Sequence, residues 1–307
     1  MLLPRRRLVG AALLHGLRRA WAPAALAAGG SLAGCTLAPD ADHDGEDAPR
    51  FAPLARPVRT AWVFGSGGPR GFTHVGVLRA LDELGLVPDL VVGASVGAVV
   101  GGLRAAGLAA ADIESLALAL NPLSVARLAL GSPERLSGAP VAELMREHVP
   151  LRRIEHLPIP LACVAARRRD ATVVAFTAGD IGLAVQASAA IEGRLTPVRI
   201  RGVAYVDADA LAPLPVRMAR RLGAVRVLAV DASVHLDRAP PGAERYREGD
   251  LRKQALVQAD ARHADLVLKP DFGYWVSFSR EFRERAIEAG YRATMAEREA
   301  LRRLHAA

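Results

Sequence analysis

Ser95 is the one polar residue in the apolar stretch VVGASVGAVVGG, which spans residues 91–102. The apolar run before it predicts a strand, and the small apolar residues after it predict a helix. A serine at such a junction either caps a buried helix or is a nucleophile held on a tight turn, for which Gly93 and Gly97 leave the necessary room. In the second case the N-terminus of the helix directs free N–H groups toward the group that the serine attacks.

A glycine-rich loop, FGSGGPRGF at residues 64–72, follows the strand that is expected before this unit. It has three interpretations: a phosphate-binding loop, a plain glycine turn, or an oxyanion hole whose N–H groups surround a developing negative oxygen. The loop lacks both the Gly-Lys-Ser/Thr sequence and the GxGxxG spacing of phosphate-binding loops. In a parallel sheet the loop and Ser95 both follow the carboxyl ends of strands and can face one another, which favours the oxyanion hole.

A nucleophilic serine also needs a base, and the informative candidate is Asp207 in YVDADALAPLPV. It follows an expected strand and opens an irregular segment with two prolines. A carboxyl group at such a strand end, among apolar residues, can have its pKa raised toward a useful value. The alternative is an aspartate that caps a turn or a helix, which is the commoner role for this residue type.

The elements that would position these residues alternate along the chain. Strands are expected at 60–64 and 89–93, and FTHVGVLRALDELG between them has apolar residues at helical spacing. This order predicts a parallel pair of strands with a right-handed crossover. Later segments predict a hairpin formed by PLACVAA and TVVAF, further alternating helices and strands, a last strand in ADLVLKP, and two C-terminal helices. The expected fold is therefore a three-layer α/β fold.

Four ordered blocks of the chain resemble the patatin-like phospholipase family. The first two are the glycine-rich loop that ends in Arg-Gly and the GxSxG around Ser95, joined by a single helix. AVQASAAIEG and YVDADALAPLPV look like the family's later ASxAIPG and DGG blocks, and the resemblance covers about residues 60–232. It implies a patatin-like α/β/α fold with a mainly parallel central sheet.

The resemblance also implies a serine–aspartate dyad that works without a catalytic histidine. Matched residue by residue, Ser95 is the nucleophile and Asp207 the base. Gly67 and Gly68 form the oxyanion hole, and Arg70 stands at the family's basic position beside them. The implied chemistry is attack of Ser95 on a carboxylic ester, formation of an acyl-enzyme, and hydrolysis by a water molecule that Asp207 activates.

The chain departs from the family pattern at several positions. Ser66 stands where the family's triple glycine usually begins, but it keeps its backbone N–H, so we expect an intact loop. Asp209 places a second carboxylate two residues from Asp207, where it can raise the pKa of Asp207 or share its role. Glu192 and Leu195 replace the usual proline and aromatic residue, which changes the expected acyl-binding wall.

A serine hydrolase triad is the rival mechanism. Its order of Ser, Asp and His can be filled by Ser95, Asp207 and either His235 or His263. Against it, a single helix joins the glycine loop to the nucleophile, as in the patatin-like family. We interpret His74, on that helix, as a packing or loop-bracing residue.

The first 35 residues have the layout of an export signal, with a basic start, an apolar middle and small residues at the end. Their last four residues resemble a lipobox, which predicts that Cys35 is acylated and becomes the N-terminus of a bacterial lipoprotein. Arg5-Arg6-Arg7 also fits a loose twin-arginine signal, so the export route stays open. No apolar run reaches the length of a membrane span, so lipid is the expected anchor.

Residues 36–59 are rich in Pro, Asp and Ala and predict a disordered tether. Its acidic cluster lacks the ligand spacing of a calcium loop. The catalytic domain is expected over 60–232 and a C-terminal helical extension, packed on that domain, over 233–307.

Charge and cysteine content exclude several other classes of function. The formal net charge of +8 falls to +3 without residues 1–34, which hold five arginines and no acid, and aromatic residues make up only 5% of the chain. We therefore expect no nucleic-acid partner. If Cys35 is acylated, Cys163 has no disulfide partner, and its apolar surroundings predict an inert core residue. The scattered histidines predict no metal site, and we expect no cofactor.

These observations predict a membrane-anchored lipid acyl hydrolase that cleaves carboxylic esters such as phospholipids. We expect it to face the periplasm on the outer membrane, because Thr36 rather than Asp follows Cys35. The alternatives are a catalytically silent lipid-binding lipoprotein and a carboxylesterase for small esters.

Overall fold

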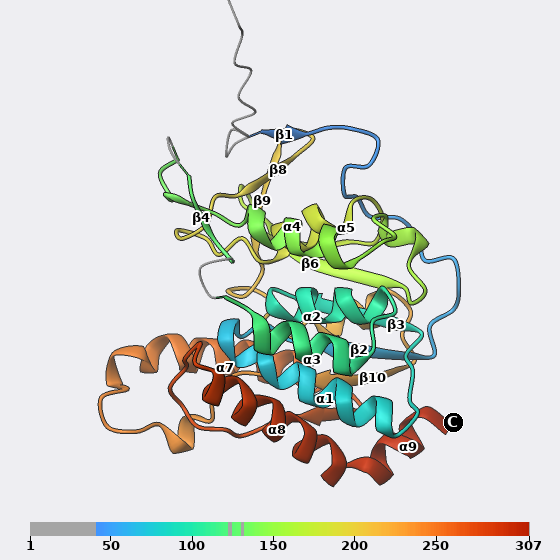
Figure 1. Cartoon of the computed structure of the whole chain (residues 1–307), viewed down its shortest axis with the longest axis vertical. Coiled ribbons are helices and arrows are strands. Elements are labelled where there is room, and N and C mark those ends of the chain that lie inside the picture. The colour runs from blue at the N-terminus through green and yellow to red at the C-terminus, as the bar shows by residue number, and fades with distance from the viewer. Residues whose placement is uncertain (1–40, 122–124, 130–131, 307) are drawn as a thin grey trace, which may run out of the picture. The chain divides into compact units, whose positions relative to one another are not determined.

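The computed structural model describes residues 41–121, 125–129 and 132–306 (Figure 1). The strands are β1 (Asp42–His43), β2 (Thr60–Phe64), β3 (Leu90–Ala94), β4 (Arg127–Leu128), β5 (Leu136–Ser137), β6 (Leu161–Arg167), β7 (Thr172–Phe176), β8 (Val198–Ile200), β9 (Val203–Asp207), β10 (Arg226–Val230) and β11 (Leu266–Leu268). The α-helices are α1 (Phe72–Glu83), α2 (Val96–Ala105), α3 (Ala110–Ala119), α4 (Ala139–His148), α5 (Ile181–Ser188), α6 (Val216–Arg221), α7 (Arg247–Ala261), α8 (Arg280–Ala296) and α9 (Arg298–Ala306).

The central sheet is mainly parallel. Its strands follow the order β1-β8-β9-β6-β3-β2-β10-β11, and β7 also pairs with β6. From β6 to β11 all neighbours in this order run parallel, whereas β7 and β9 run antiparallel to β6. The β6–β7 hairpin, the strand β11 and the two C-terminal helices agree with the sequence prediction.

Helices cover both faces of this sheet. Side chains alternate along each strand, so each strand presents apolar residues to both faces. In β2, Trp62 and Phe64 point into one apolar core, while Ala61 and Val63 point into the other. Figure 1 shows α1, α3 and α8 in front of the sheet, and α6 and α7 contribute to the second core. The predicted three-layer α/β/α fold is therefore confirmed.

The predicted tether is wrong for the residues that the structure describes from 41 to 59. Asp42–His43 pair with β8, and the Arg50 N–H donates to Ala178 O at 2.9 Å. Ala48 is only 1% exposed. The composition of this segment suggested disorder because it contains few apolar residues. Backbone hydrogen bonds to the domain hold it in place instead.

The C-terminal part belongs to the domain core. It supplies β11 to the central sheet, and α8 packs along α1. At this helix crossing a Cβ on Gly76 would lie 1.7 Å from Ile287 O, and one on Gly290 would lie 2.1 Å from Thr73 O. The expected boundary between a catalytic domain ending at residue 232 and a C-terminal extension therefore does not separate two structural units. None of the described helices is long and apolar enough to cross a bilayer.

Gly76→Ala is expected to destabilise the protein by about 3 kcal/mol or more, because its methyl group collides with the backbone of α8. Gly249→Ala is the matched control, since Gly249 lies in α7 in open space, where an added Cβ would meet no atom of a neighbouring element within 4 Å. It should be neutral or slightly stabilising, because alanine favours a helix over glycine by about 0.5–1 kcal/mol. Urea unfolding of both variants provides the measurement, and equal midpoints would contradict close α1–α8 packing.

Candidate active site

Ser95 occupies a strained turn between β3 and α2. Its backbone has φ 55° and ψ −125°, in a region that residues other than glycine rarely adopt. A Cβ on Gly97 would lie 2.1 Å from Phe64 O, and one on Gly93 would lie 2.4 Å from Gly97 O. The two flanking glycines therefore have a steric reason, and the turn matches the strand-turn-helix expected from the sequence.

The register of β6 brings Asp207 to Ser95. Ala94, the last residue of β3, pairs with Val164, and Asp207, the last residue of β9, pairs with the next residue, Ala165. Since β7 pairs with β6 along this whole stretch, β3 and β9 must share the other edge of β6. The two strands therefore meet head to head on β6, carboxyl end to carboxyl end. Ser95 directly follows β3, and Asp207 is the last residue of β9.

The environment of Asp207 suits a general base. Its side chain is buried, and its Oδ1 accepts a hydrogen bond of 2.8 Å from the Asp209 N–H. Burial raises the pKa of Asp207 to about 7, and the negative charge of Asp209 adds to this effect. Hydrogen bonds from the Ser95 side chain and the Asp209 N–H, and the positive charge of Lys253, oppose it. Asp207 can therefore exchange a proton near neutral pH.

The glycine-rich loop packs against the nucleophile turn at both of its ends. A Cβ on Gly71 would lie 2.3 Å from Val96 Cγ1, and the Gly97 position touches the backbone of Phe64 and Gly65. Within the described ranges the N–H groups of Gly67 and Gly68 donate to no protein acceptor. These groups are therefore free to receive a negative oxygen.

Arg70, which stands at the family's basic position, braces this loop. Its guanidinium is buried and donates to Ala232 O at 2.7 Å and to Gly273 O at 2.8 Å. It also lies 4.3 Å from the ring centroid of Phe272. Its backbone N–H donates to Gly67 O at 3.1 Å. Local sequence patterns contain no sign of these backbone acceptors, because they follow in the chain more than 160 residues later.

His74 is a bracing residue, as expected. It is fully buried, its Nε2 lies 2.8 Å from Gly65 O, and its ring contacts that of Phe64. Because a carbonyl only accepts, Nε2 carries the proton. Burial lowers the pKa of His74 to about 4, so the imidazole stays neutral and holds the loop without acting as a base.

The two histidines of the rival triad do not join the site. His263 is exposed and lies before β11, at the amino ends of the parallel strands, whereas Ser95 lies at their carboxyl ends. His235 follows β10, and its buried Nε2 has no hydrogen-bond partner among the described residues. The groups that shift the pKa of Asp207 include neither histidine.

Ser188 is a site residue that sequence reasoning missed, although it lies within the AVQASAAIEG block. Its buried Oγ accepts a hydrogen bond of 2.9 Å from the Ser95 N–H and donates one of 2.5 Å to Val164 O. It thus ties the nucleophile turn to β6. The available signal was its place in the AVQASAAIEG block, where a serine stands between small apolar residues.

Ser188→Ala is expected to destabilise the protein by about 2 kcal/mol, because it leaves the buried Ser95 N–H without its acceptor and removes the hydrogen bond to Val164 O. The resulting shift of the turn should also lower kcat about tenfold or more. Ser115→Ala is the control, since this exposed hydroxyl bonds to its own helix at Ala111 O. A Ser188→Ala protein with unchanged stability and kcat would refute the bracing role.

The departures from the family pattern fall into two groups. Ser66 and Asp209 contact each other and Lys253 of α7, a residue for which the sequence offered no signal. Glu192 is exposed, and its carboxylate lies 3.4 Å from Arg168 Nε. Leu195 is half-buried.

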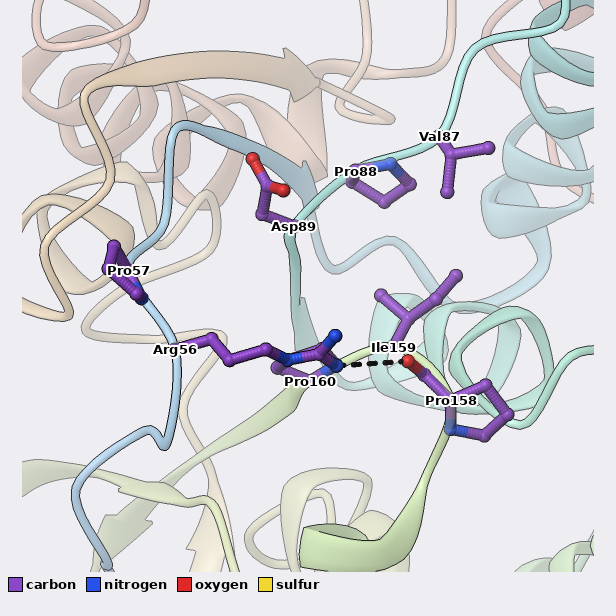
Figure 2. Close-up of a pocket in the computed structure, with 8 residues that line it drawn as sticks. All are labelled: Arg56, Pro57, Val87, Pro88, Asp89, Pro158, Ile159 and Pro160. Carbon is purple, nitrogen blue, oxygen red and sulfur yellow. Dashed lines mark hydrogen bonds between the residues drawn. The ribbon is translucent and has the colours of Figure 1, made fainter.

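A pocket of about 220 Å³ lies at the end of the sheet opposite to the Ser95 site (Figure 2). Asp89 and Pro160 in its lining precede β3 and β6, so the pocket is at the amino ends of the parallel strands. Arg56 donates to Pro158 O at 3.3 Å, and Asp89 accepts the Thr60 N–H at 2.9 Å. Its charged groups are engaged and none of its described lining residues is a nucleophile, so it is distinct from the site around Ser95.

Metal-ligating side chains do not gather elsewhere in the described part of the chain, where no group of His, Cys, Asp and Glu residues forms a candidate metal site. Cys163 is free and buried in β6, and burial raises its pKa, so the thiol stays protonated. Cys35 and the expected export signal lie outside the described residues.

The sequence profile of the patatin-like phospholipase family matches residues 62–220, just over half of the chain. The chain belongs to this family. The matched region contains the glycine loop, Ser95, Ser188 and Asp207, so the patatin-like match and the geometry concern the same residues.

Curated relatives of this patatin-like chain include three with similar regions. An uncharacterized NTE family protein of Mycobacterium tuberculosis is 34% identical over 189 residues, which cover 61% of this chain and 52% of the relative. A lysophospholipase of Lodderomyces elongisporus is 30% identical, with 62% and 14% covered. The mouse patatin-like phospholipase domain-containing protein 6 is 30% identical, with 59% and 14% covered. The chain thus spans about half or less of the length of these relatives.

Among solved structures, VipD from Legionella pneumophila is similar with a TM-score of 0.49 and 15% sequence identity. The similarity covers 85% of this chain and 71% of that one.

Proposed function

We propose that the protein is a lipid acyl hydrolase in which Ser95 and Asp207 form a catalytic dyad. The observation that carries this proposal is the head-to-head meeting of β3 and β9 on β6, which brings a strained serine and a buried carboxyl group together. Membership of the patatin-like phospholipase family supports an ester of a lipid as the substrate.

In the proposed acylation step Asp207 accepts the proton of the Ser95 hydroxyl while Oγ bonds to the carbonyl carbon of the ester. The carbonyl oxygen becomes negative and accepts hydrogen bonds from the N–H groups of Gly67 and Gly68, each worth about 10²–10³ in rate. The tetrahedral intermediate then collapses. The C–O bond to the alcohol breaks, the leaving oxygen takes the proton from Asp207, and the acyl group remains on Ser95.

Deacylation reverses these roles with water. Asp207 accepts a proton from a water molecule while the oxygen of that water bonds to the acyl carbon. The same N–H groups stabilise the oxyanion. Collapse breaks the bond to Ser95 Oγ, which regains its proton from Asp207, and the fatty acid leaves. One carboxyl group serves both steps because its pKa lies near the working pH.

The test measures fatty acid release by the full-length protein in detergent from a lysophospholipid, a diacyl phospholipid and a short-chain ester. A fluorescent long-chain phosphonate reports covalent reaction at Ser95, with Ser95→Ala as its control. Long-chain release together with labelling would support the lipid hydrolase. Turnover of the short ester alone would favour a small-ester carboxylesterase, and a folded protein without labelling would favour the catalytically silent lipid-binding lipoprotein.

We also propose that the protein is an exported lipoprotein, anchored through Cys35 on the periplasmic side of the outer membrane. The signal-like pattern of residues 1–35 and the lipobox-like residues before Cys35 support this. Expressed in a bacterial host with an alkyne fatty acid, the wild type should be labelled and Cys35→Ser should not. An unlabelled wild type in the soluble periplasmic fraction would refute the anchor.

A further inference from the structure

Two polar side chains, those of Ser66 and Asp209, occupy positions where the family pattern has glycine, and they contact each other. The Ser66 hydroxyl donates to Asp209 Oδ1, and Lys253 Nζ lies 2.6 Å from the same oxygen. Lys253 also lies 3.3 Å from Ser66 Oγ. Each departure thus has the other as its partner, and one cation of α7 binds both.

This Ser66–Asp209–Lys253 cluster joins the two halves of the candidate site. Ser66 immediately precedes Gly67 of the glycine loop, and Asp209 donates its N–H to Asp207 Oδ1 at 2.8 Å. The third member comes from α7, whose Lys253 side chain reaches Ser66 beside the glycine loop. A displacement of Lys253 would consequently act on both the oxyanion donors and the base.

The charges in the cluster also act on the base. Burial raises the pKa of Asp209, but the charge of Lys253 and hydrogen bonds from Lys253 and Ser66 outweigh it and leave this pKa below its ordinary value. Asp209 therefore keeps its negative charge beside Asp207. The charged groups that act on Asp207 are Asp209 and Lys253, with opposite signs.

We propose that Lys253 is a positioning residue, which ties the glycine loop to the turn that carries Asp207 and balances the charge of Asp209 beside that base. This inference rests on the proposed function. The sequence contains Arg252 next to Lys253, and its contact is different in kind: it forms an exposed ion pair with Glu248 one helical turn away. Lys253, unlike this neighbour, reaches across to both loops.

Lys253→Met is expected to lower kcat at pH 7 about tenfold or more, because the loop and the turn lose their common tie. It also removes a positive charge near Asp207, so the acidic limb of the kcat/KM profile should move up by about half a pH unit. Lys253→Arg should recover most of the loss by keeping the charge. Arg252→Met, the matched control on the same helix, should leave both the rate and the limb unchanged.

Asp209→Asn should shift the acidic limb of the kcat/KM profile in the opposite direction. This test does not depend on whether the lysine variant is stable. Asparagine keeps an oxygen for Ser66 but removes the negative charge, so the acidic limb should move down by about half a pH unit. The triple variant Ser66→Gly/Asp209→Gly/Lys253→Met removes the whole cluster, so it leaves no unpaired carboxylate and should be more active than Lys253→Met alone.

The decisive comparison is the direction of the two limb shifts in variants that circular dichroism shows to be folded. Opposite shifts establish that Lys253 and Asp209 act on the base. Limbs that coincide with the wild type, or that move in the same direction, overturn the proposal. A wild type that neither reacts with the phosphonate nor releases fatty acid would instead refute the proposed function, so the two failures are distinguishable.

Discussion

Ser95→Ala is expected to lower kcat/KM for ester hydrolysis by about four orders of magnitude or more. In the proposed mechanism this hydroxyl forms the acyl-enzyme, because the other site hydroxyls, those of Ser66 and Ser188, donate to Asp209 and to Val164 O. Rate assays on the most rapidly hydrolysed ester, with phosphonate labelling, provide the measurement. Residual activity within tenfold of the wild type would show that another residue attacks the ester.

The same position predicts a gain in stability when the side chain is removed completely. Ser95 has φ 55° and ψ −125°, a conformation that costs about 1–3 kcal/mol for a residue with a Cβ. Ser95→Ala keeps the Cβ and so should keep this strain, whereas Ser95→Gly relieves it at a smaller cost in chain entropy. We expect Ser95→Gly to be more stable than Ser95→Ala by about 1 kcal/mol in urea unfolding. If the alanine variant is equally stable, the turn stores no strain.

Local sequence patterns predicted the nucleophile turn because its physical requirements are local. A serine between an apolar strand and a small-residue helix needs glycine at both flanking positions, and Gly93 and Gly97 stand where a Cβ would collide with the backbone. The glycine loop and the helix between it and Ser95 are local in the same sense. The alternation of strands and helices likewise predicted the three layers and the hairpin of β6 and β7.

What could not be predicted depends on contacts between distant residues. The meeting of Ser95 with Asp207 requires β9 to run antiparallel on the same edge of β6 as β3, and this register has no signature in either strand. Lys253 lies in a helix rich in charged residues that resembles a solvated one, yet it contacts Asp209 from 44 residues away. Arg70 was assigned by its position beside the glycines, whereas its long side chain reaches carbonyls beyond β10.

Asp207→Asn is expected to abolish turnover and to stabilise the protein above pH 7. Burial raises the pKa of Asp207 from 3.8 to about 7. Wild-type activity should therefore rise with pH through a midpoint near 7, because the base must be unprotonated to accept the serine proton. Asparagine keeps the shape and can accept the Asp209 N–H, but it cannot accept a proton, so kcat should fall by about 10³–10⁴ above pH 7, where the wild-type base is unprotonated.

The stability effect follows from the same pKa. A carboxyl group whose pKa is higher in the folded than in the unfolded protein favours folding while it is protonated, below about pH 4, and loses this contribution as the pH rises through 7. Above pH 7 the wild type carries a buried charge that asparagine lacks, at a cost of up to about 4 kcal/mol. Unfolding curves should therefore separate the two proteins at pH 8 and converge near pH 4.

Asp170→Asn provides the control with the opposite sign. Asp170 lies on the β6–β7 turn, where hydrogen bonds with Thr172 and Arg167 lower its pKa, so this carboxylate favours folding at neutral pH and loses the contribution in acid. Its replacement should be slightly destabilising at pH 8, where the replacement of Asp207 stabilises. If both variants respond to pH in the same direction, Asp207 does not carry the raised pKa that the dyad requires, because only a raised folded-state pKa reverses the sign.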